Sequence, residues 1–236
     1  MSRDYQGDLV ELSAFGTVRS LRCTPDHQVL VHHKTSQARS WKKAGDVQIG
    51  DCLITPKASM GEPVVSEVLV KLVAWFICEG HVNGNRAVFS LNGTKQEEID
   101  HVTGLLDALA YQWSITRTNE SGSSAHVRVN SVTLADRLVA WCGSGAFNKR
   151  VPFDIISGHE QAFFDELIRG DGHVVKPKKV NHHGSDMYST VSVGLAFDVM
   201  MLASTLGRRS HLAKRTGVGD TVICGVKTFC NDSYTV

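Results

Sequence analysis

Hydrophobic residues recur at intervals of three and four along two separate segments, and this spacing predicts two amphipathic helices. The first segment is Val70–Val82 and the second is Gln161–Val174. Each ends in an acid followed by Gly, His and Val, and the acids Glu79 and Asp171 are 171 − 79 = 92 residues apart. We therefore expect an internal repeat built on these two helices.

Alternation of apolar and polar residues predicts strands in the same order after each helix. The predicted strands lie at residues 86–92, 112–117, 125–130, 174–179, 187–193, 221–225 and 233–236. Further helices are predicted at 94–109, with a capping box that opens at Thr94, and at 132–141 and 195–206. This order predicts an α+β fold of two pseudo-symmetric αββαββα repeats. Their antiparallel sheets should form a saddle with one face on helices and one face free.

The N-terminal residues 1–58 have a different pattern. Short alternating segments at 8–12, 17–23 and 28–31 precede a Gly50-Asp51 turn that joins two further strands. Short strands separated by Gly and Pro predict a small all-β unit. Residues 59–63 are predicted to be a linker, so the two-repeat domain should occupy residues 64–236, with repeat one at 64–157 and repeat two at 158–236.

Composition excludes several classes of protein. The chain has 236 residues and a formal net charge of +1, so any nucleic-acid binding must rest on local basic patches. No apolar run is long enough to span a membrane, and no signal peptide opens the sequence. The six cysteines have no metal-ligand spacing, which favours reduced thiols, Cys78 and Cys142 among them in the core. We expect a cytoplasmic protein with no membrane partner.

An acid directly before Gly at the end of each predicted helix is unusual. A helix C-terminus carries partial negative charge, so a carboxylate there is disfavoured unless a cation compensates it. One such acid is most simply a solvated side chain. The pair, Glu79 and Asp171, instead suggests that the two helix ends meet around a metal ion.

The segments Leu72–Gly80 and Phe164–Gly172 resemble the paired signature helices of the LAGLIDADG homing endonucleases. The last acid and the final Gly are kept in both segments, whereas Ile77 and Arg169 stand where the signature has its first Asp. The resemblance implies that the two helices pack together at the centre of the molecule and that their terminal acids bind divalent metal and cut DNA. Two copies in one chain imply a monomer with internal pseudo-twofold symmetry.

The resemblance also implies roles for individual residues. Glu79 and Asp171 should be the metal ligands and catalytic acids, with backbone carbonyls from Cys78 and Gly170 as additional ligands. Mg²⁺ suits such oxygen donors, and Mn²⁺ is expected to be able to replace it. The histidines His81 and His173 are expected to flank this site without binding metal.

Basic residues near the acids are candidates for stabilising the transition state. The segment Asn148–Pro152 resembles the Lys-x-(Ile/Val)-Pro motif of intein endonucleases, which makes Lys149 the catalytic candidate; the alternative is a surface lysine before a proline turn. Lys214 and Lys227 compete for the equivalent place in the second repeat. Arg169 would contact phosphate or form a salt bridge.

Free sheet faces should bind double-stranded DNA, because a two-stranded ribbon fits the major groove. Alternation and polarity predict which outward side chains contact the DNA; the alternative is that these side chains only form a solvated strand face. The predicted contacts are Arg86, Ser90, Asn92, Arg117, Arg128, Lys176, Lys178, Lys179, His182, His183, Tyr188, Ser192, Lys214, Arg215 and Lys227.

The N-terminal segment resembles part of an intein (Hint) domain. Cys23–His27 is similar to the intein motif whose Thr and His assist the first acyl shift, which implies such roles for Thr24 and His27. Trp41–Leu53 is similar to the segment that follows it. The residues that splicing needs at both intein ends do not occur here, so we expect that this segment cannot splice by itself.

These patterns together predict an intein-derived, site-specific homing endonuclease that hydrolyses double-stranded DNA at a long target with metal. One alternative is a non-cleaving, maturase-like nucleic-acid-binding protein of the same fold. The other is a protein-splicing fragment that needs a partner chain.

Overall fold

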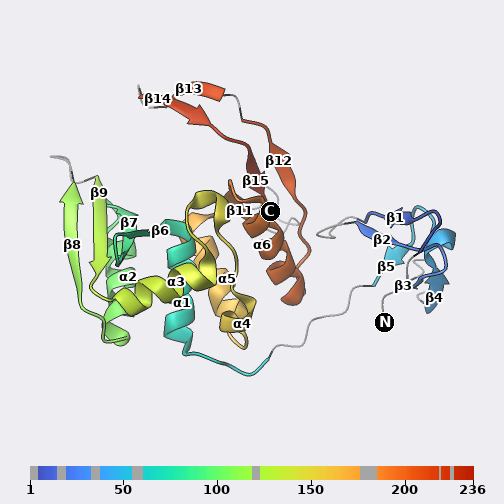
Figure 1. Ribbon diagram of the computed structural model, residues 1–236, viewed down its shortest axis with the longest axis horizontal. Helices are drawn as coiled ribbons and strands as arrows, with labels where there is room; N and C mark the ends of the chain where they lie inside the picture. Colours follow the sequence, from blue (N-terminus) through green and yellow to red (C-terminus); the bar gives the residue numbers. More distant parts are fainter. Residues whose placement is uncertain are drawn as a thin grey trace.

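The computed structural model describes residues 5–14, 20–32, 38–54, 61–118, 123–175, 185–217, 219–223 and 226–236. It is an α+β structure in which two four-stranded antiparallel sheets lie on either side of a central helix pair (Figure 1). The helices are α1 Glu67–Glu79, α2 Gln96–Ala108, α3 Val132–Cys142, α4 Phe153–Ile156, α5 Glu160–Asp171 and α6 Val193–Thr205, with 3-10 turns η1 Ala44–Asp46 and η2 Ala146–Asn148.

The two sheets have the same topology. The first has the order β6-β7-β9-β8 and the second has the order β10-β11-β15-β12, so β15 takes the place of β9 and β12 that of β8. Gly80 lies opposite Phe89 in the first sheet, and Gly172 lies opposite Tyr188 in the second. The strands are β6 Gly80–Asn83, β7 Arg86–Asn92, β8 Trp113–Thr118, β9 Ser124–Val129, β10 Gly172–Val175, β11 Ser185–Thr190, β12 Ala213–Arg215 and β15 Ser233–Thr235.

The second repeat carries an additional hairpin between β12 and β15. Its strands β13 Gly219–Ile223 and β14 Val226–Cys230 form a separate two-stranded sheet that projects beyond the rest of the repeat in Figure 1. The first repeat connects the equivalent strands β8 and β9 without such an insertion.

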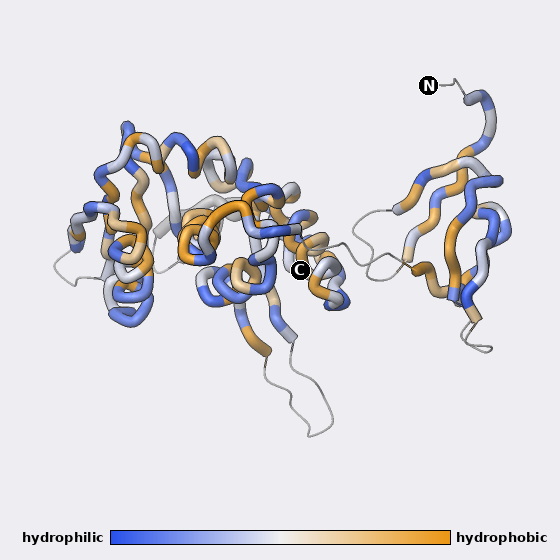
Figure 2. The backbone as a smooth tube through the Cα atoms, turned by 90° about the horizontal axis from the view of Figure 1, so that it is seen from below, coloured by the Kyte–Doolittle hydropathy of each residue, from blue (hydrophilic) through white to orange (hydrophobic). Residues whose placement is uncertain are grey.

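Helices α1 and α5 pack side by side, and α1 is buried on nearly every side. Its residues Leu72–Ile77 are all buried, because α5, α2, α3 and the first sheet surround it. A helix that is apolar all round is stable only in such an interior position. Seen from below, hydrophobic stretches lie inside this part of the chain and hydrophilic stretches outside it (Figure 2).

Most predicted elements are confirmed within a few residues. For the strand at 86–92, the first and the last residue both agree with the prediction. The capping box at Thr94 is wrong. Its hydroxyl donates to the Asn92 side chain at 2.8 Å, and α2 begins without a side-chain cap. The strand predicted at 187–193 is also partly wrong. It ends at Thr190, and Ser192 instead caps α6 by accepting a hydrogen bond from the Leu195 backbone.

The N-terminal residues form a small β unit. It consists of a β1-β2 sheet and a β4-β3-β5 sheet, with buried Val29, Val31 and Ala44. Its strands are β1 Val10–Leu12, β2 Leu21–Cys23, β3 Gln28–His32, β4 Arg39–Lys43 and β5 Cys52–Leu53. In the described part of the chain, no helix has the length and apolar character needed to cross a bilayer.

The contact between α1 and α5 predicts opposite effects for two glycine substitutions. A Cβ on Gly170 would lie 2.8 Å from the Cys78 Sγ, whereas a Cβ on Gly104, in α2, would meet nothing within 4 Å. We expect Gly170→Ala to lower the free energy of unfolding by about 1–3 kcal/mol, because the helices must move apart. Gly104→Ala should raise it by about 0.5–1 kcal/mol through helix propensity. Urea unfolding of both variants tests this, and equal effects would contradict the close approach.

Candidate active site and nucleic-acid interface

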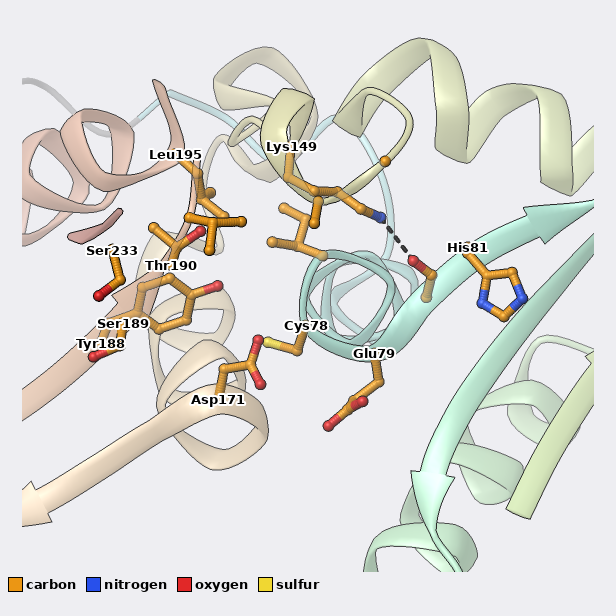
Figure 3. Close-up of a pocket in the computed structure, with 15 residues that line it drawn as sticks. Cys78, Glu79, His81, Lys149, Asp171, Tyr188, Ser189, Thr190, Leu195 and Ser233 are labelled. Atoms are coloured by element: carbon orange, nitrogen blue, oxygen red, sulfur yellow. Dashed lines mark hydrogen bonds between the residues drawn. The ribbon is translucent and has the colours of Figure 1, made fainter. Parts of the chain in front are cut away.

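The C-terminal ends of α1 and α5 bring Glu79 and Asp171 to one pocket (Figure 3). The pocket has a volume of about 520 Å³ and receives residues from both repeats, including the connection between α3 and α4 in repeat one. Its lining comprises Ile77, Cys78, Glu79, Gly80, His81, Gly145, Ala146, Lys149, Asp171, Tyr188, Ser189, Thr190, Val191, Leu195 and Ser233.

Glycine is required after each acid because the chain turns sharply against its own helix. A Cβ on Gly80 would lie 2.5 Å from the Cα of Phe76, and one on Gly172 would lie 2.5 Å from the Cα of Ile168. Both glycines have an extended backbone, with φ of −94° and −86°. The close approach, rather than a left-handed helix cap, therefore explains the Gly in both copies.

In the described part of the chain, neither of the two carboxylates forms an ion pair with a lysine or arginine side chain. Burial raises the pKa of Glu79 to about 7, and the charges of Asp171 and Glu98 add to the shift while Lys95 opposes it. Burial also raises the pKa of Asp171 to about 6, and the neighbouring Cys78 thiol opposes this shift. The pocket therefore concentrates negative charge that a cation would relieve.

The chemistry of these donors fits a divalent cation. Two carboxylates supply hard oxygen ligands from facing helices, which is the donor type that Mg²⁺ and Mn²⁺ prefer. In the described residues no group of three or more His, Cys, Asp or Glu side chains converges. A metal here would thus need further ligands from backbone, water or substrate, and Cys78 and Gly170 remain predicted carbonyl donors.

Lys149 is buried, and its position is explained by α1. Its Nζ donates to the carbonyls of Phe76 at 2.7 Å and Gly80 at 2.9 Å, and it lies 3.7 Å from the centre of the Phe76 ring. Burial lowers the pKa of Lys149 to about 8. The ammonium compensates the negative end of α1. The alternative of a surface lysine is wrong.

Helix α6 fixes the segment that carries Lys149. The Arg150 guanidinium makes two hydrogen bonds to the buried Asp198, one of them 2.8 Å long, and the Val151 backbone also donates to Asp198. Ser192 donates to the Lys149 carbonyl at 3.0 Å. Sequence reasoning missed this anchor, although an Asp within the apolar run of α6 was a signal for it.

A second polar network joins α1, α2 and α5, and it decides the role of Arg169. The buried Glu166 accepts hydrogen bonds from Trp75 at 2.6 Å and from His101 at 2.9 Å. Arg169 donates to the other ring nitrogen of His101 and pairs with Glu97 at 3.4 Å. Of the two roles predicted for Arg169, the structure shows the salt bridge.

The first sheet has one face that none of the described helices covers, and apart from the buried Val88 this face is mainly polar. Its buried residues, including Phe89 and Val127, alternate with residues on the other face. Ser90 and His126 lie opposite each other there and share a hydrogen bond of 3.0 Å. The predicted contacts on this face are Arg86, Ser90, Asn92 and Arg128.

Arg117 was predicted to lie on the free face of the first sheet, but it lies on the opposite face, which packs against the helices. It is opposite the buried Ala125 and donates to the Gly93 carbonyl at 2.6 Å and to Gln96 at 2.7 Å. Arg117 therefore stabilises the start of α2 and does not share the free face with the other predicted DNA contacts.

In the second sheet, Tyr188 and Ser192 were predicted as exposed contacts and are both buried, because Tyr188 faces the helices and Ser192 caps α6. Lys214 is exposed and paired with Asp232 at 2.7 Å, whereas Arg215 is exposed without lining the pocket. His173 is exposed on β10 and does not line the pocket, whereas His81 does. The side chains of Lys176, Lys178, Lys179, His182, His183 and Lys227 lie outside the described part.

Thr24 and His27 form a turn in the β unit. The His27 backbone donates to the Thr24 carbonyl at 3.1 Å, and both side chains are outside the interior. A hydrogen bond from the Thr24 side chain lowers the pKa of Asp26. The turn matches the predicted Thr-Pro turn, and a role in splicing stays a prediction.

Comparison with known proteins gives distant similarities. No protein-family profile matches the chain. The replication factor C small subunit of Methanocaldococcus jannaschii is 27% identical over 204 residues, which are 84% of this chain and 10% of that protein. The ATP-dependent DNA helicase Hel308 of Thermococcus kodakarensis is 27% identical over 161 residues, 64% of this chain and 14% of that protein. The chain thus spans only 10% to 14% of the curated relatives it matches.

Three solved structures are also similar at low identity. A structure of mesophilic variants from the homing endonuclease I-DmoI aligns over 72% of this chain and 81% of its own, with 16% identity and a TM-score of 0.43. I-DmoI in complex with DNA and Mn aligns over 72% and 87%, with 16% identity and a TM-score of 0.43. The N-terminal LAGLIDADG domain of WhiA aligns over 75% and 80%, with 14% identity and a TM-score of 0.41. Similarity at this level carries no argument about function.

The raised pKa values predict that removing a charge at the pocket stabilises the metal-free protein. The unfolded carboxyl ionises near pH 4, whereas folded Asp171 holds its proton to about pH 6, so stability is lost as pH rises between these values. We expect Asp171→Asn to raise the free energy of unfolding by roughly 1–2 kcal/mol at pH 7.5 in chelator, with no gain at pH 4.

Asp165→Asn is the matched control, because Asp165 lies on the same helix, is exposed and accepts a hydrogen bond from Gln161. It should show no such pH dependence. Mg²⁺ should stabilise the parent and leave Asp171→Asn unchanged. Thermal unfolding at both pH values decides this, and a less stable Asp171→Asn at pH 7.5 in chelator would contradict the crowding of charge.

Proposed function

We propose that the chain is a metal-dependent, site-specific double-strand DNA endonuclease of the LAGLIDADG type. The observation that carries the proposal is the meeting of Glu79 and Asp171, one from each repeat, in one pocket between two sheets of identical topology. Phosphodiester hydrolysis needs a site that neutralises phosphate and activates water, and paired carboxylates that hold a metal ion suit both tasks.

The residues of the pocket divide the chemistry among them. Glu79 and Asp171 would hold the cation, which supplies an activated water and charge neutralisation when it is bound. The Cys78 thiol, which donates to the Leu167 carbonyl at 3.8 Å, lines the pocket next to both acids. Lys149 contributes fixed positive charge at the edge of the same pocket, where it stabilises the charge that develops on phosphate.

The free sheet faces would bind the DNA on both sides of the pocket. A ribbon of antiparallel strands fits the major groove, and Arg86, Arg128 and Arg215 are exposed or half-exposed at the strands that would enter it. The two repeats together supply the twofold arrangement that a dimer would otherwise provide, so we propose a monomer. Phosphate contacts by arginine should make binding fall as salt rises.

We further propose that the chain derives from an intein. The two curated relatives are named as a replication factor subunit and as a helicase, yet each is similar to this chain over only 10% or 14% of its length. A shared segment within differently named proteins is what an inserted element would leave. The resemblance of Cys23–His27 to an intein motif supports this origin.

One observation favours a second candidate, a nucleic-acid-binding protein that does not cut. Lys149 is the one lysine or arginine in the described lining of the pocket, and neither Lys214 nor a described residue of repeat two supplies a counterpart. A site with a single basic group would bind and position DNA, but it would supply less positive charge to stabilise the transition state of cleavage.

Selection for cleavage from a randomised DNA library with Mg²⁺ separates the two functions. We expect the parent to cut a recovered long site and Asp171→Asn to bind that site without cutting it, because the ligand is lost while the sheet faces remain. Asp165→Asn, on the exposed side of the same helix, should cut like the parent.

Lys149→Met should reduce cleavage by about 10²-fold or more at unchanged affinity for the DNA. Binding without cutting by the parent as well as by Asp171→Asn would favour the non-cleaving protein. If no sequence is bound even at low salt, the assignment of the sheet faces to DNA is wrong.

A further inference from the structure

The first two turns of α1 and α5 line a second pocket, at the opposite end of the helix pair from Glu79 and Asp171. This N-terminal pocket has a volume of about 430 Å³, and its lining includes Glu67 and Lys71 from α1 and Glu160 from α5. Helix α1 has 13 residues and rises 1.5 Å per residue, so the two pockets lie roughly 20 Å apart. A metal ion at the first pocket is therefore too distant to neutralise the second.

Negative charge is in excess in the N-terminal pocket. Glu67, Glu160 and Glu166 line it, and Lys71 is the one lysine or arginine in its described lining. The basic groups gather at one acid, because Lys71 Nζ lies 2.7 Å and His159 Nδ1 lies 3.9 Å from the Glu67 carboxylate. A helix N-terminus carries about half a positive charge, so the two helix ends together offset roughly one carboxylate. Among the described residues, no basic side chain pairs with Glu160.

Glu160 provides the observation that points to a ligand. It is the first residue of α5, and 7% of its surface is exposed. Its Oε2 atom is buried and has no hydrogen-bond partner within the described part of the chain. A buried carboxylate oxygen without a partner destabilises the folded protein, because burial removes its hydration and nothing replaces it. A cationic donor that entered the pocket would remove this cost.

Two further carboxylate oxygens remain available in the described structure. Glu166 accepts the hydrogen bonds from Trp75 and His101 through the same atom, Oε2, so its Oε1 takes no part in them. Glu67 pairs with Lys71 through Oε1, which leaves Oε2 outside that ion pair. The pocket thus offers one acceptor from each of three glutamates, and these glutamates belong to two different helices.

These acceptors suit ammonium groups better than a metal ion. In the described residues, no group of three or more His, Cys, Asp or Glu side chains converges as metal ligands must. The pocket also has room for roughly ten water molecules or more, whereas a metal ion needs far less space. A primary ammonium group carries a positive charge and three N–H donors. A linear polyamine spaces such groups along a methylene chain, which matches carboxylates that lie apart.

We propose that the N-terminal pocket binds a linear polyamine. One primary ammonium group donates to Glu160 Oε2, and a second reaches the remaining acceptors of Glu67 and Glu166. The bound chain bridges α1 and α5 where the two helices begin, so it stabilises the helix pair in proportion to its concentration. The site lies apart from the pocket of Glu79 and Asp171 and does not depend on the endonuclease assignment.

Calorimetric titration of the full chain with putrescine, in chelator, tests the proposal. We expect saturable binding that Glu160→Gln weakens by about tenfold or more, because the amide keeps the shape of the side chain and removes its charge. Asp171→Asn is the matched control, since it removes one carboxylate from the other pocket, and it should bind putrescine like the parent. Full binding by Glu160→Gln, or equal weakening by Asp171→Asn, would overturn the proposal.

Two other measurements make the test independent of folding and of charge alone. Glu67→Gln changes a half-exposed side chain and should weaken binding by about threefold in a protein that unfolds like the parent. Unchanged binding there would contradict the bridge between the helices. Tetramethylammonium has a positive charge but no N–H donor, so it should not displace putrescine. Displacement by it, or binding of butylammonium as tight as that of putrescine, would overturn the assignment to a polyamine.

Discussion

The contact between α1 and α5 is the constraint on which the rest of the structure depends. It brings two negative helix ends and two carboxylates, Glu79 and Asp171, to one place, and like charges oppose that arrangement. Hydrophobic burial along α1 and the hydrogen bond from Trp75 to Glu166 hold the helices together against it. Neither repeat could bury its own central helix alone, so each completes the core of the other.

Much of this arrangement could be predicted from the sequence. Period and polarity locate the two acid-bearing helices and the strand at 86–92, because a half-buried element leaves a regular pattern. The assignment of faces was less successful. Arg117 and Tyr188 each alternate as an outward residue would, yet Arg117 reaches back to α2 and Tyr188 lies under the helices.

What the sequence could not predict are contacts between distant segments. Trp75 and Glu166 are 166 − 75 = 91 residues apart, and Arg150 and Asp198 are 198 − 150 = 48 residues apart, so neither pair leaves a local pattern. The same holds for Lys149, whose carbonyl partners belong to the end of α1. Its burial follows from tertiary packing, which no single-segment period contains.

The two sheets place different side chains at equivalent points. Ser90 pairs with His126 in the first sheet, and Ser189 pairs with Thr235 in the second. In a homodimer every substitution appears twice, so both halves of a reading surface must change together. Here a covalent connection between the repeats removes that restriction. Each half can acquire substitutions separately, so under the proposed function the surface is free to evolve toward a target whose two halves have unrelated sequences.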